Sequence, residues 1–561
     1  MASKPKKHPP KQIMGQLLQL NIEKRYEELS ALALKIIGFY PDSYNVWNIL
    51  GIAYLGQKDF KNGIRSFQKA LKFKPNYYEA LNNLGNAYNN NKNFASANKA
   101  YNQALCLQPQ SCDVLNNLAS VAIQQENLDE AEIYLNRALK IKPDHPEALY
   151  NLGNIFWKKG DLKEAKLAYQ KSVKYNPKFG QAFHNLGAVF MELERLDAAL
   201  ESFGNALSTE YRNAELLHDV GVALRQKGFV DESINALQKG LDYKPGCPEL
   251  TFNLALSYLA KGDFLSGFNL YESRYFREGS TILLPRKSLI WDGIESLEGK
   301  HFFVYEEQGF GDILQFCRFL PKLKEKGAKI TFKVTEGLHH LLSSLDKDIN
   351  LLSNFSKLCP FDFECSLLSL PYLLGVELQT ISSPNQYLYA DQKKVSEWAG
   401  KLDKSSFNVG ICWQGSEAKA DSGRFFPLSL FEGISKIPNV RLISLQKGKG
   451  EEQLNDISFE LEHFTGQIDN DGNSFSDTAA IIKNCDLILT PDCSIAHLAG
   501  ALGQPTWIIL KKVPNWRWCS NFSKSPWYPK TSLYRQEIFE DWEQVFARVE
   551  IEMTAILAQQ N

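Results

Sequence analysis

A pattern of large and small apolar residues recurs every 34 residues through the first half of this 561-residue chain. One copy consists of Trp47, Leu50, Gly51, Tyr54, Phe67, Ala70 and Pro75. Similar copies follow until the pattern fades after Tyr271, and a weaker copy ends at Pro41. One unit of this length cannot bury its own apolar face, so neighbouring copies must stack into a shared core.

The pattern resembles the tetratricopeptide repeat, in which each copy is a pair of helices. Small residues in both helices let the pair approach, and a proline stops the second helix. The resemblance implies an all-α superhelix of about seven to eight repeats over residues 13–279, with a concave inner groove. The first twelve residues are basic and rich in proline, and we expect residues 1–12 to form a disordered tail.

One polar column runs through the repeats at a single position of the first helix. Its members are Asn83, Asn117, Asn151, Asn185 and Asn253, with Asp219 in the remaining copy. Asparagine is a mediocre helix former, so helix propensity does not account for the column. It resembles the asparagine ladder of the O-linked N-acetylglucosamine transferase superhelix, which implies a groove that holds an extended peptide backbone through amide donors and acceptors. The alternative is that these amides only bond neighbouring helices.

After a junction near residue 280, apolar runs of strand length alternate with helical patterns. We expect strands at residues 301–305, 329–334, 349–352, 407–413, 440–446, 487–490 and 506–510. This alternation predicts a parallel, doubly wound sheet in each of two α/β units, residues 280–395 and 396–561. We expect the polar segment 391–406 to be a linker, and the C-terminal helix to pack across a domain interface.

The stretch Asp486–Leu510 reads as strand, sharp turn, short helix and strand. Asp492 or Ser494 can cap that helix. A strand that runs into a helix N-terminus directs unpaired N–H groups and a positive dipole end at one spot, which suits a phosphate or diphosphate. Ser494 and His497 can add donors there. The alternative is an ordinary β-α-β unit with no ligand.

The second half resembles a known glycosyltransferase family in several motifs. They are Gln308–Ile313, Trp413–Gly415 with Arg424, Asp477–Ile482, Asp492-x-Ser494-x-x-His497, Trp516–Trp518, Ser525–Pro529 and Arg535-Gln536. With the repeats, these are similar to bacterial tetratricopeptide proteins that carry a glycosyltransferase family 9-like (heptosyltransferase-like) domain. That resemblance implies a GT-B architecture of two Rossmann-like halves. The sequence departs from the family at Cys493 and Ser494, where Thr and Gly are common.

The resemblance also implies a mechanism. Asp312 would be the base for the acceptor hydroxyl, and the reaction would need no metal, would need no cofactor beyond the nucleotide-sugar co-substrate and would invert the sugar. Arg424 and Lys419 would supply positive charge. The donor-binding set would comprise Trp413, Gln446, Asp492, Ser494 and His497 together with Arg424. The alternative for Asp312 is that it only caps its helix.

Composition narrows the function classes. The formal net charge is −1, which gives no global attraction to nucleic acid or an anionic membrane. No apolar run reaches the length of about 18 residues that a membrane span needs. Ten cysteines without CxxC pairs predict reduced thiols in a cytoplasmic protein. The resemblance implies a glycosyltransferase whose repeats present a protein acceptor. The alternatives are a scaffold with a degenerate transferase domain, or a transferase acting on glycan or lipid whose repeats dock a partner.

Overall fold

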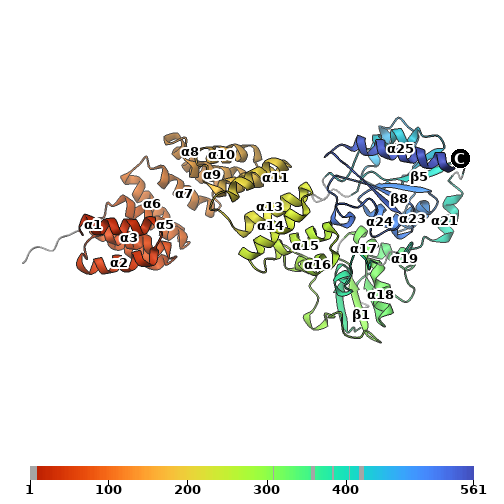
Figure 1. The fold of residues 1–561 in the computed structure, drawn as a ribbon, viewed down its shortest axis with the longest axis horizontal. Coiled ribbons are helices and arrows are strands. Elements are labelled where there is room, and N and C mark those ends of the chain that lie inside the picture. Colours follow the sequence, from red (N-terminus) through yellow and green to blue (C-terminus); the bar gives the residue numbers. More distant parts are fainter. Residues whose placement is uncertain are drawn as a thin grey trace, which may run out of the picture. The chain divides into compact units, whose positions relative to one another are not determined.

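The structure is a computed structural model that describes residues 9–307, 309–355, 360–381, 384–402, 405–415 and 423–560. Its chain forms two compact units, Met1–Arg212 and Asn213–Asn561, each described here by itself. Figure 1 shows helices alone in the first unit, and helices followed by parallel sheets in the second. Within the described ranges, none of the helices has both the length and the apolarity needed to cross a bilayer.

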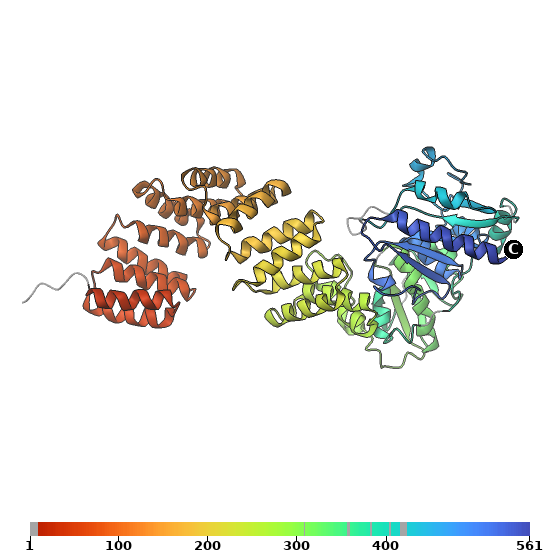
Figure 2. The ribbon, with the colours of Figure 1, turned by 45° about the horizontal axis from the view of Figure 1, so that its top comes forward.

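The first unit is a run of six helix pairs (Figure 2). The helices are α1 (Lys11–Ile22), α2 (Tyr26–Phe39), α3 (Tyr44–Gly56), α4 (Phe60–Phe73), α5 (Tyr78–Asn90), α6 (Phe94–Leu107), α7 (Cys112–Gln124), α8 (Leu128–Ile141), α9 (Pro146–Lys158), α10 (Leu162–Tyr175), α11 (Gly180–Glu192) and α12 (Leu196–Leu207). Helix α1 begins at Lys11, inside the predicted tail, so the prediction of a disordered tail is wrong for residues 11 and 12. Residues 1–8 of the tail lie outside the described residues.

The repeat spacing has a direct steric cause. In α11, Gly187 faces the ring of Phe203 on α12, and a Cβ at that position would overlap the ring. Gly85 faces Tyr101 in the same way in an earlier repeat. These glycines therefore each admit one aromatic ring from the second helix, and Gly221 admits Leu237 in the same way, so this contact sets the distance within the pair.

The second unit begins with two further helix pairs, α13 (Ala214–Lys227), α14 (Val230–Tyr243), α15 (Pro248–Lys261) and α16 (Phe264–Tyr271), followed by the short helix η1 (Glu272–Phe276). These helices are compact with the sheets, whereas the sequence predicted a boundary near residue 280. Aromatic contacts explain the grouping. The ring centroid of Phe264 lies 5.1 Å from that of Trp527, and Phe268 lies 5.8 Å from Trp516. All four side chains are buried in one core.

The first sheet has four parallel strands in the order β3-β2-β1-β4. They are β1 (His301–Tyr305), β2 (Lys329–Lys333), β3 (Asn350–Leu352) and β4 (Phe363–Ser366). Around it lie η2 (Lys287–Leu289), α17 (Phe310–Phe316), η3 (Cys317–Phe319), α18 (Leu320–Glu325), η4 (Glu336–Leu338), α19 (His339–Leu342), η6 (Leu367–Ser369) and α20 (Leu370–Leu373). The chain leaves β1 toward β2 and returns to its other side as β4, which is the predicted doubly wound topology.

The second sheet has five parallel strands in the order β6-β5-β7-β8-β9. They are β5 (Phe407–Ile411), β6 (Val440–Ser444), β7 (Leu487–Pro491), β8 (Thr506–Leu510) and β9 (Thr531–Arg535). The associated helices are η8 (Leu428–Phe431), α22 (Glu432–Ser435), η9 (Glu451–Asn455), α23 (Ser476–Lys483), α24 (Ser494–Ala501) and η10 (Trp516–Trp518). Strands β4 and β9 were not among those predicted from the sequence.

Two predictions were wrong, one for the polar segment 391–406 and one for the C-terminal helix. The expected linker contains helix α21 (Gln392–Ala399), because Trp398 is buried and its Nε1 donates to Asp477 Oδ1 at 3.0 Å. The C-terminal helix α25 (Trp542–Gln560) packs on the second sheet rather than across an interface. Its Val545, Phe546 and Val549 share a core cluster with residues of β5, β7 and β8.

Candidate functional site

Both sheets reverse their winding direction at one point, and the loops that follow the strands there are natural ligand positions. In the first sheet the reversal lies between β1 and β4, and in the second between β5 and β7. The segments at these carboxyl edges are Glu306–Glu307, Cys412–Gly415 and Asp492–Cys493. Helix α17 follows β1, and helix α24 follows β7.

The N-termini of α17 and α24 meet. A Cβ on Gly311 of α17 would lie 3.0 Å from His497 Cδ2 and 3.7 Å from the Cα of Ser494, both on α24. A side chain at position 311 would crowd the His497 ring, so glycine favours this close approach. The predicted residues on the two halves of the C-terminal region are thereby brought to one place, which spacing in the sequence could not show.

Neither Asp492 nor Ser494 caps α24, which corrects that prediction. The N-cap residue is Cys493, and no side-chain oxygen caps the helix. Asp492 is buried and faces Arg424 instead, with 3.7 Å between Asp492 Oδ2 and Arg424 Nε. Ser494 is the partly exposed first residue of the helix. Arg424 is therefore the cation next to this helix terminus; Lys419 and Gln308 lie outside the described residues.

Asp312 lies in the first turn of α17 and forms an ion pair with Arg517. Burial raises the pKa of the Asp312 carboxyl, and the guanidinium of Arg517 opposes that rise. The alternative role as a helix cap is not what the structure shows, because Gly309 is the N-cap and no side chain caps α17. The carboxylate is thus held by a cation at the meeting point of the two helices.

Arg517 is the site residue that residue-by-residue reasoning did not single out. It lies in η10, and Asn515 Oδ1 accepts from its Nη1 at 3.0 Å. The backbone N–H of Ser520, just after η10, donates to the carbonyl of Ala260 on α15 at 2.9 Å. Through this hydrogen bond the last repeat supports the segment that carries Arg517. The signal in the sequence was the Trp516-Arg517-Trp518 triplet, which places one cation between two large rings.

His497 is buried at the contact of the two helices. Its Nδ1 lies 2.9 Å from the hydroxyl of Tyr528, and its ring stacks on Trp518 at 5.1 Å between centroids. Burial lowers the pKa of His497 well below its usual range, and the nearby guanidinium groups of Arg517, Arg318 and Arg424 lower it further. The imidazole is therefore neutral at neutral pH, and Trp518 seals this contact rather than standing open to solvent.

Gln446 and Trp413, two predicted donor-binding residues, support the loop after β5. Gln446 Oε1 accepts from the backbone N–H groups of Trp413 at 3.2 Å and Gln414 at 3.1 Å. The Trp413 ring is fully buried, and its Nε1 donates to the carbonyl of Gly450 at 3.0 Å. These two buried side chains hold the loop in position.

Several buried polar atoms around the helix contact have no hydrogen-bond partner among the described residues. They are Asp492 Oδ2, Arg517 Nε, Trp518 Nε1 and both amide atoms of Gln315 on α17. Buried polar atoms are nearly always paired, so such a cluster is typical of a place where a polar ligand or water binds.

The carboxyl edge of the first sheet is open on one side and filled on the other. A hollow of about 340 Å³ is lined by Glu306, Glu307, Gly309, Phe310, Ile313 and Thr335. Beside it, Arg274 of η1 donates from Nη2 to Glu307 Oε1 at 2.7 Å and to Ser369 Oγ at 2.8 Å. The hollow therefore lies between α17 and the loop after β2, and Asp312 is not among the residues that line it.

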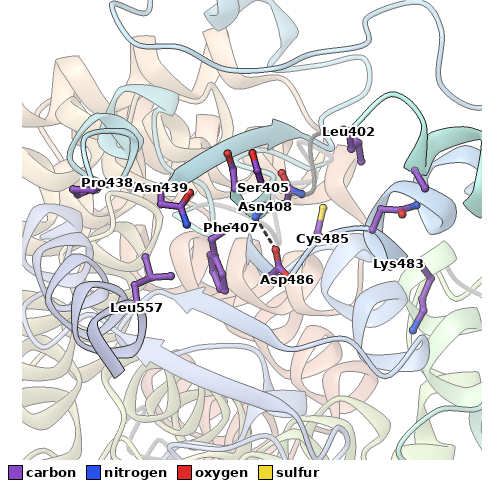
Figure 3. Close-up of a pocket in the computed structure, with 13 residues that line it drawn as sticks. Leu402, Ser405, Phe407, Asn408, Pro438, Asn439, Lys483, Cys485, Asp486 and Leu557 are labelled. Atoms are coloured by element: carbon purple, nitrogen blue, oxygen red, sulfur yellow. Dashed lines mark hydrogen bonds between the residues drawn. The ribbon is translucent and has the colours of Figure 1, made fainter. Parts of the chain in front are cut away.

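A second pocket, of about 480 Å³, lies at the opposite edge of the second sheet (Figure 3). Its lining includes Phe407 and Asn408 at the start of β5, and Asp486 just before β7, whose Oδ2 accepts from the backbone N–H of Asn408 at 2.8 Å. Ligands of such sheets bind at the carboxyl ends of strands. This pocket is separate from the predicted residues.

The asparagine column bonds between neighbouring repeats. Nδ2 of Asn117 donates to Asn82 Oδ1 at 3.0 Å, and Nδ2 of Asn151 donates to Asn116 Oδ1 at 2.8 Å. Asn83, Asn185 and Asn253 make equivalent bonds to Asn48, Asn154 and His218. In its repeat, Asp219 accepts a hydrogen bond from the neighbouring His218 at 2.9 Å. One amide hydrogen of each asparagine is thus used within the array. The amide of Asn253 is used further, because its Oδ1 accepts from Arg225 Nη2 at 2.9 Å and its Nδ2 also donates to the Glu249 carbonyl at 3.0 Å. In Asn117 and Asn151 the carbonyl oxygen and second hydrogen remain for a ligand.

In the part of the chain that the structure describes, no three or more His, Cys, Asp or Glu side chains are grouped as metal ligands. The two carboxylates of the Asp469-Asn470-Asp471 segment have protein partners. Asp469 Oδ2 accepts from the Thr478 hydroxyl at 2.5 Å, and Asp471 Oδ2 lies 2.8 Å from Lys394 Nζ.

Comparisons with known proteins agree on the repeats. Residues 23–216 match the family described as the cilia and flagella-associated protein 70 C-terminal domain, and residues 219–275 match the tetratricopeptide repeat. Protein FlbA of Caulobacter vibrioides is 25% identical over 338 residues, which are 54% of this chain and 55% of that protein. The chain thus spans about half the length of this curated relative.

Similar solved structures cover only part of the chain. The Cut9–Hcn1 hetero-tetramer chain is 20% identical with a TM-score of 0.40, over 43% of this chain and 48% of its own. PilF of Pseudomonas aeruginosa is 19% identical with a TM-score of 0.34, over 37% of this chain and 94% of its own. The helical region and the family matches together identify the chain as a tetratricopeptide-repeat protein, with two parallel α/β sheets in its C-terminal part.

Proposed function

We propose that the second unit is a glycosyltransferase that moves a sugar from a nucleotide-sugar donor to a hydroxyl of a protein acceptor. The observation that carries this proposal is the meeting of α17 and α24, which sets a partly buried carboxylate against a helix N-terminus. Glycosyl transfer needs a base on one side of the reacting carbon and charge stabilisation for a departing diphosphate on the other. The two helices supply these two functions from two different sheets.

In this proposal the diphosphate lies at the N-terminus of α24. The helix has no side-chain oxygen as its cap, so a diphosphate would displace the Cys493 thiol from the N–H groups of Ile495 and Ala496 and meet the positive end of the dipole. Arg424 adds a full positive charge within reach of the same loop, since its Nε lies 3.7 Å from Asp492 Oδ2. Charge on the leaving group would thereby be stabilised by the protein alone, in the GT-B manner and without a metal.

The acceptor hydroxyl is proposed to approach Asp312 from the hollow lined by Glu306 and Thr335. Arg517 keeps the carboxylate oriented. Direct attack with Asp312 as base would invert the sugar's configuration. The free amide atoms of Asn117 and Asn151 would hold an extended segment of the acceptor along the repeats.

A second candidate is a repeat scaffold whose α/β unit binds a ligand without catalysis. The ion pair between Asp312 and Arg517 favours it, because a base that is neutralised by a cation is less ready to take a proton. Loss of turnover on replacing Asp312, with ligand binding retained, separates the two candidates.

Thermal shift with a panel of nucleoside diphosphates and nucleotide sugars tests the donor site. A ligand that binds only the folded state raises its stability with the logarithm of concentration over Kd. We expect one nucleotide class to raise the melting temperature of the wild type and of Arg286→Ala, but not of Arg424→Ala. Arg286 is the control because its exposed side chain pairs with Glu364, away from α24. A panel that leaves the wild type unshifted would contradict the proposal.

A further inference from the structure

Two thiols meet where the second sheet reverses its winding. Cys412 directly follows β5, and Cys493 is the N-cap of α24 after β7. Strands β5 and β7 are parallel neighbours, with Ile411 paired to Leu489, so both loops leave the same edge of the sheet. The distance between Cys412 Sγ and Cys493 Sγ is 4.0 Å. Nothing in the proposed transfer reaction uses either thiol.

The two thiols have different surroundings. Cys412 is buried, whereas Cys493 is partly exposed. The hydroxyl of Thr490 lies 3.2 Å from Cys493 Sγ. A hydrogen bond from Cys412 lowers the pKa of the Cys493 thiol, and so do the Thr490 hydroxyl and the backbone N–H groups of Ile495 and Ala496. The same contact and burial raise the pKa of Cys412. Thiolates at helix N-termini are the reactive form of cysteine.

We propose that Cys412 and Cys493 form a redox-reactive dithiol, in which Cys493 attacks low-molecular-weight disulfides and Cys412 resolves the product. The Cys493 thiolate attacks one sulfur of the oxidant, the oxidant's S–S bond breaks, and one thiolate leaves. Cys412 then loses its proton and its sulfur attacks Cys493 Sγ, which releases the second thiolate. Two electrons pass from the two cysteines to the oxidant, which becomes two thiols.

The geometry allows this closure with little movement. A disulfide needs the sulfurs about 2.05 Å apart, so they must approach by roughly 2 Å. Rotation of the partly exposed Cys493 side chain is the available motion, because Cys412 is buried and its Sγ lies 3.2 Å from Gln446 Oε1 and 3.5 Å from the Gln414 carbonyl oxygen. Rotation would move the Cys493 sulfur away from the first N–H groups of α24. The inference does not depend on the transfer activity.

The test uses the reduced full-length protein, glutathione disulfide as oxidant and N-ethylmaleimide as quench, followed by non-reducing digestion and mass spectrometry. We expect a peptide that links Cys412 to Cys493, with a mass two hydrogens lower than the sum of the two reduced peptides. Cys412→Ser should stop at a glutathione adduct on Cys493, because the resolving thiol is absent. Cys485→Ser is the matched control: Cys485 is also buried at the second sheet, and the variant should form the link as the wild type does.

Cys106 gives an internal reference, because its exposed thiol reports that the oxidant is active. The proposal is wrong if Cys106 acquires glutathione in the wild type while Cys412 and Cys493 are both still alkylated. It is also wrong if Cys493→Ser, with an unchanged circular dichroism spectrum, acquires glutathione at Cys412. The wild-type measurement decides the question even where a variant fails to fold.

Discussion

Arg274 and Glu307 form a buried ion pair, with 2.7 Å between Nη2 and Oε1 and 2% of each side chain exposed. Arg274 comes from η1 at the end of the repeats, and Glu307 follows β1. The hydroxyl groups of Ser366 and Ser369 complete the network at the end of β4. One guanidinium from the helical region thus fills the crevice between β1 and β4, and it fixes the helices to the sheet.

Replacing Arg274 by alanine should destabilise the second unit by about 3–5 kcal/mol, because Glu307 would be left as a buried charge without its partner. Urea unfolding followed by tryptophan fluorescence measures this change. Lys436→Ala is the surface control, since both side chains of its pair with Glu432 are exposed, and it should cost at most about 1 kcal/mol. Equal effects of the two substitutions would contradict this account of the joint.

Glycine substitutions within one repeat should have opposite effects. Gly187→Ala forces a Cβ into the ring of Phe203 and should destabilise the first unit by about 1–3 kcal/mol. Gly204→Ala on α12 meets no atom within 4 Å and should stabilise it by about 0.5–1 kcal/mol, because alanine loses less backbone entropy. Thermal unfolding by circular dichroism compares them. If both substitutions destabilise the unit equally, the contact between Gly187 and the Phe203 ring is not what sets the distance between the two helices.

His497 should make stability fall in mild acid. Its folded-state pKa is lowered by burial, so the unfolded chain, with a pKa of about 6.5, binds the proton more readily. The contribution of His497 to the free energy of unfolding is therefore fully present above about pH 6.5. Below that pH the free energy of unfolding falls by at most about 1.4 kcal/mol per pH unit. The change in the free energy of unfolding with pH should be smaller in His497→Gln. It should be unchanged in His463→Gln, because His463 is exposed. Denaturation midpoints at pH 7.5 and 5.5 give the comparison, and equal slopes in all three proteins would count against the lowered pKa.

Asp312→Asn should reduce turnover by about a hundredfold or more, since a general base typically contributes 10²–10⁴. The nucleotide selected by the thermal-shift panel should still bind. Because burial raises the pKa of Asp312, the wild-type rate should fall in acid at a pH above the usual carboxyl range. Asp471→Asn is the control, as Asp471 pairs with Lys394 outside the site. Unchanged turnover in Asp312→Asn would remove its role as base.

The sequence was most informative where a local pattern has one structural solution. The repeat period predicted the helix pairs, and apolar runs predicted seven strands within two residues of their ends. The short strands β4 and β9 were missed, because Phe363–Ser366 and Thr531–Arg535 lack a long apolar run. Helix α21 was missed because its one buried anchor, Trp398, is bonded to Asp477 more than 70 residues away.

Prediction of the candidate site divides in the same way. Asp312, Asp492 and Ser494 could be named as candidate site residues because each follows a recognisable strand. Arg517 could be assigned to Asp312 only from the fold, since the ion pair joins residues 205 positions apart. The buried environment of His497 also depends on α17, Trp518 and Tyr528, which no local pattern brings together.

Recombination at residue 280 would not exchange one intact module for another. Helices α13–α16 belong to the same compact unit as the sheets, and Phe264 and Phe268 fill the core around Trp516 and Trp527. A hybrid that keeps only the part after residue 280 would lose Phe264 and Phe268, which would expose the rings of Trp516 and Trp527. It would also lose Arg274, the ion-pair partner of Glu307. A hybrid joined near residue 212 would retain both. The unit that must be transferred intact therefore contains both sheets and the two repeats that precede them.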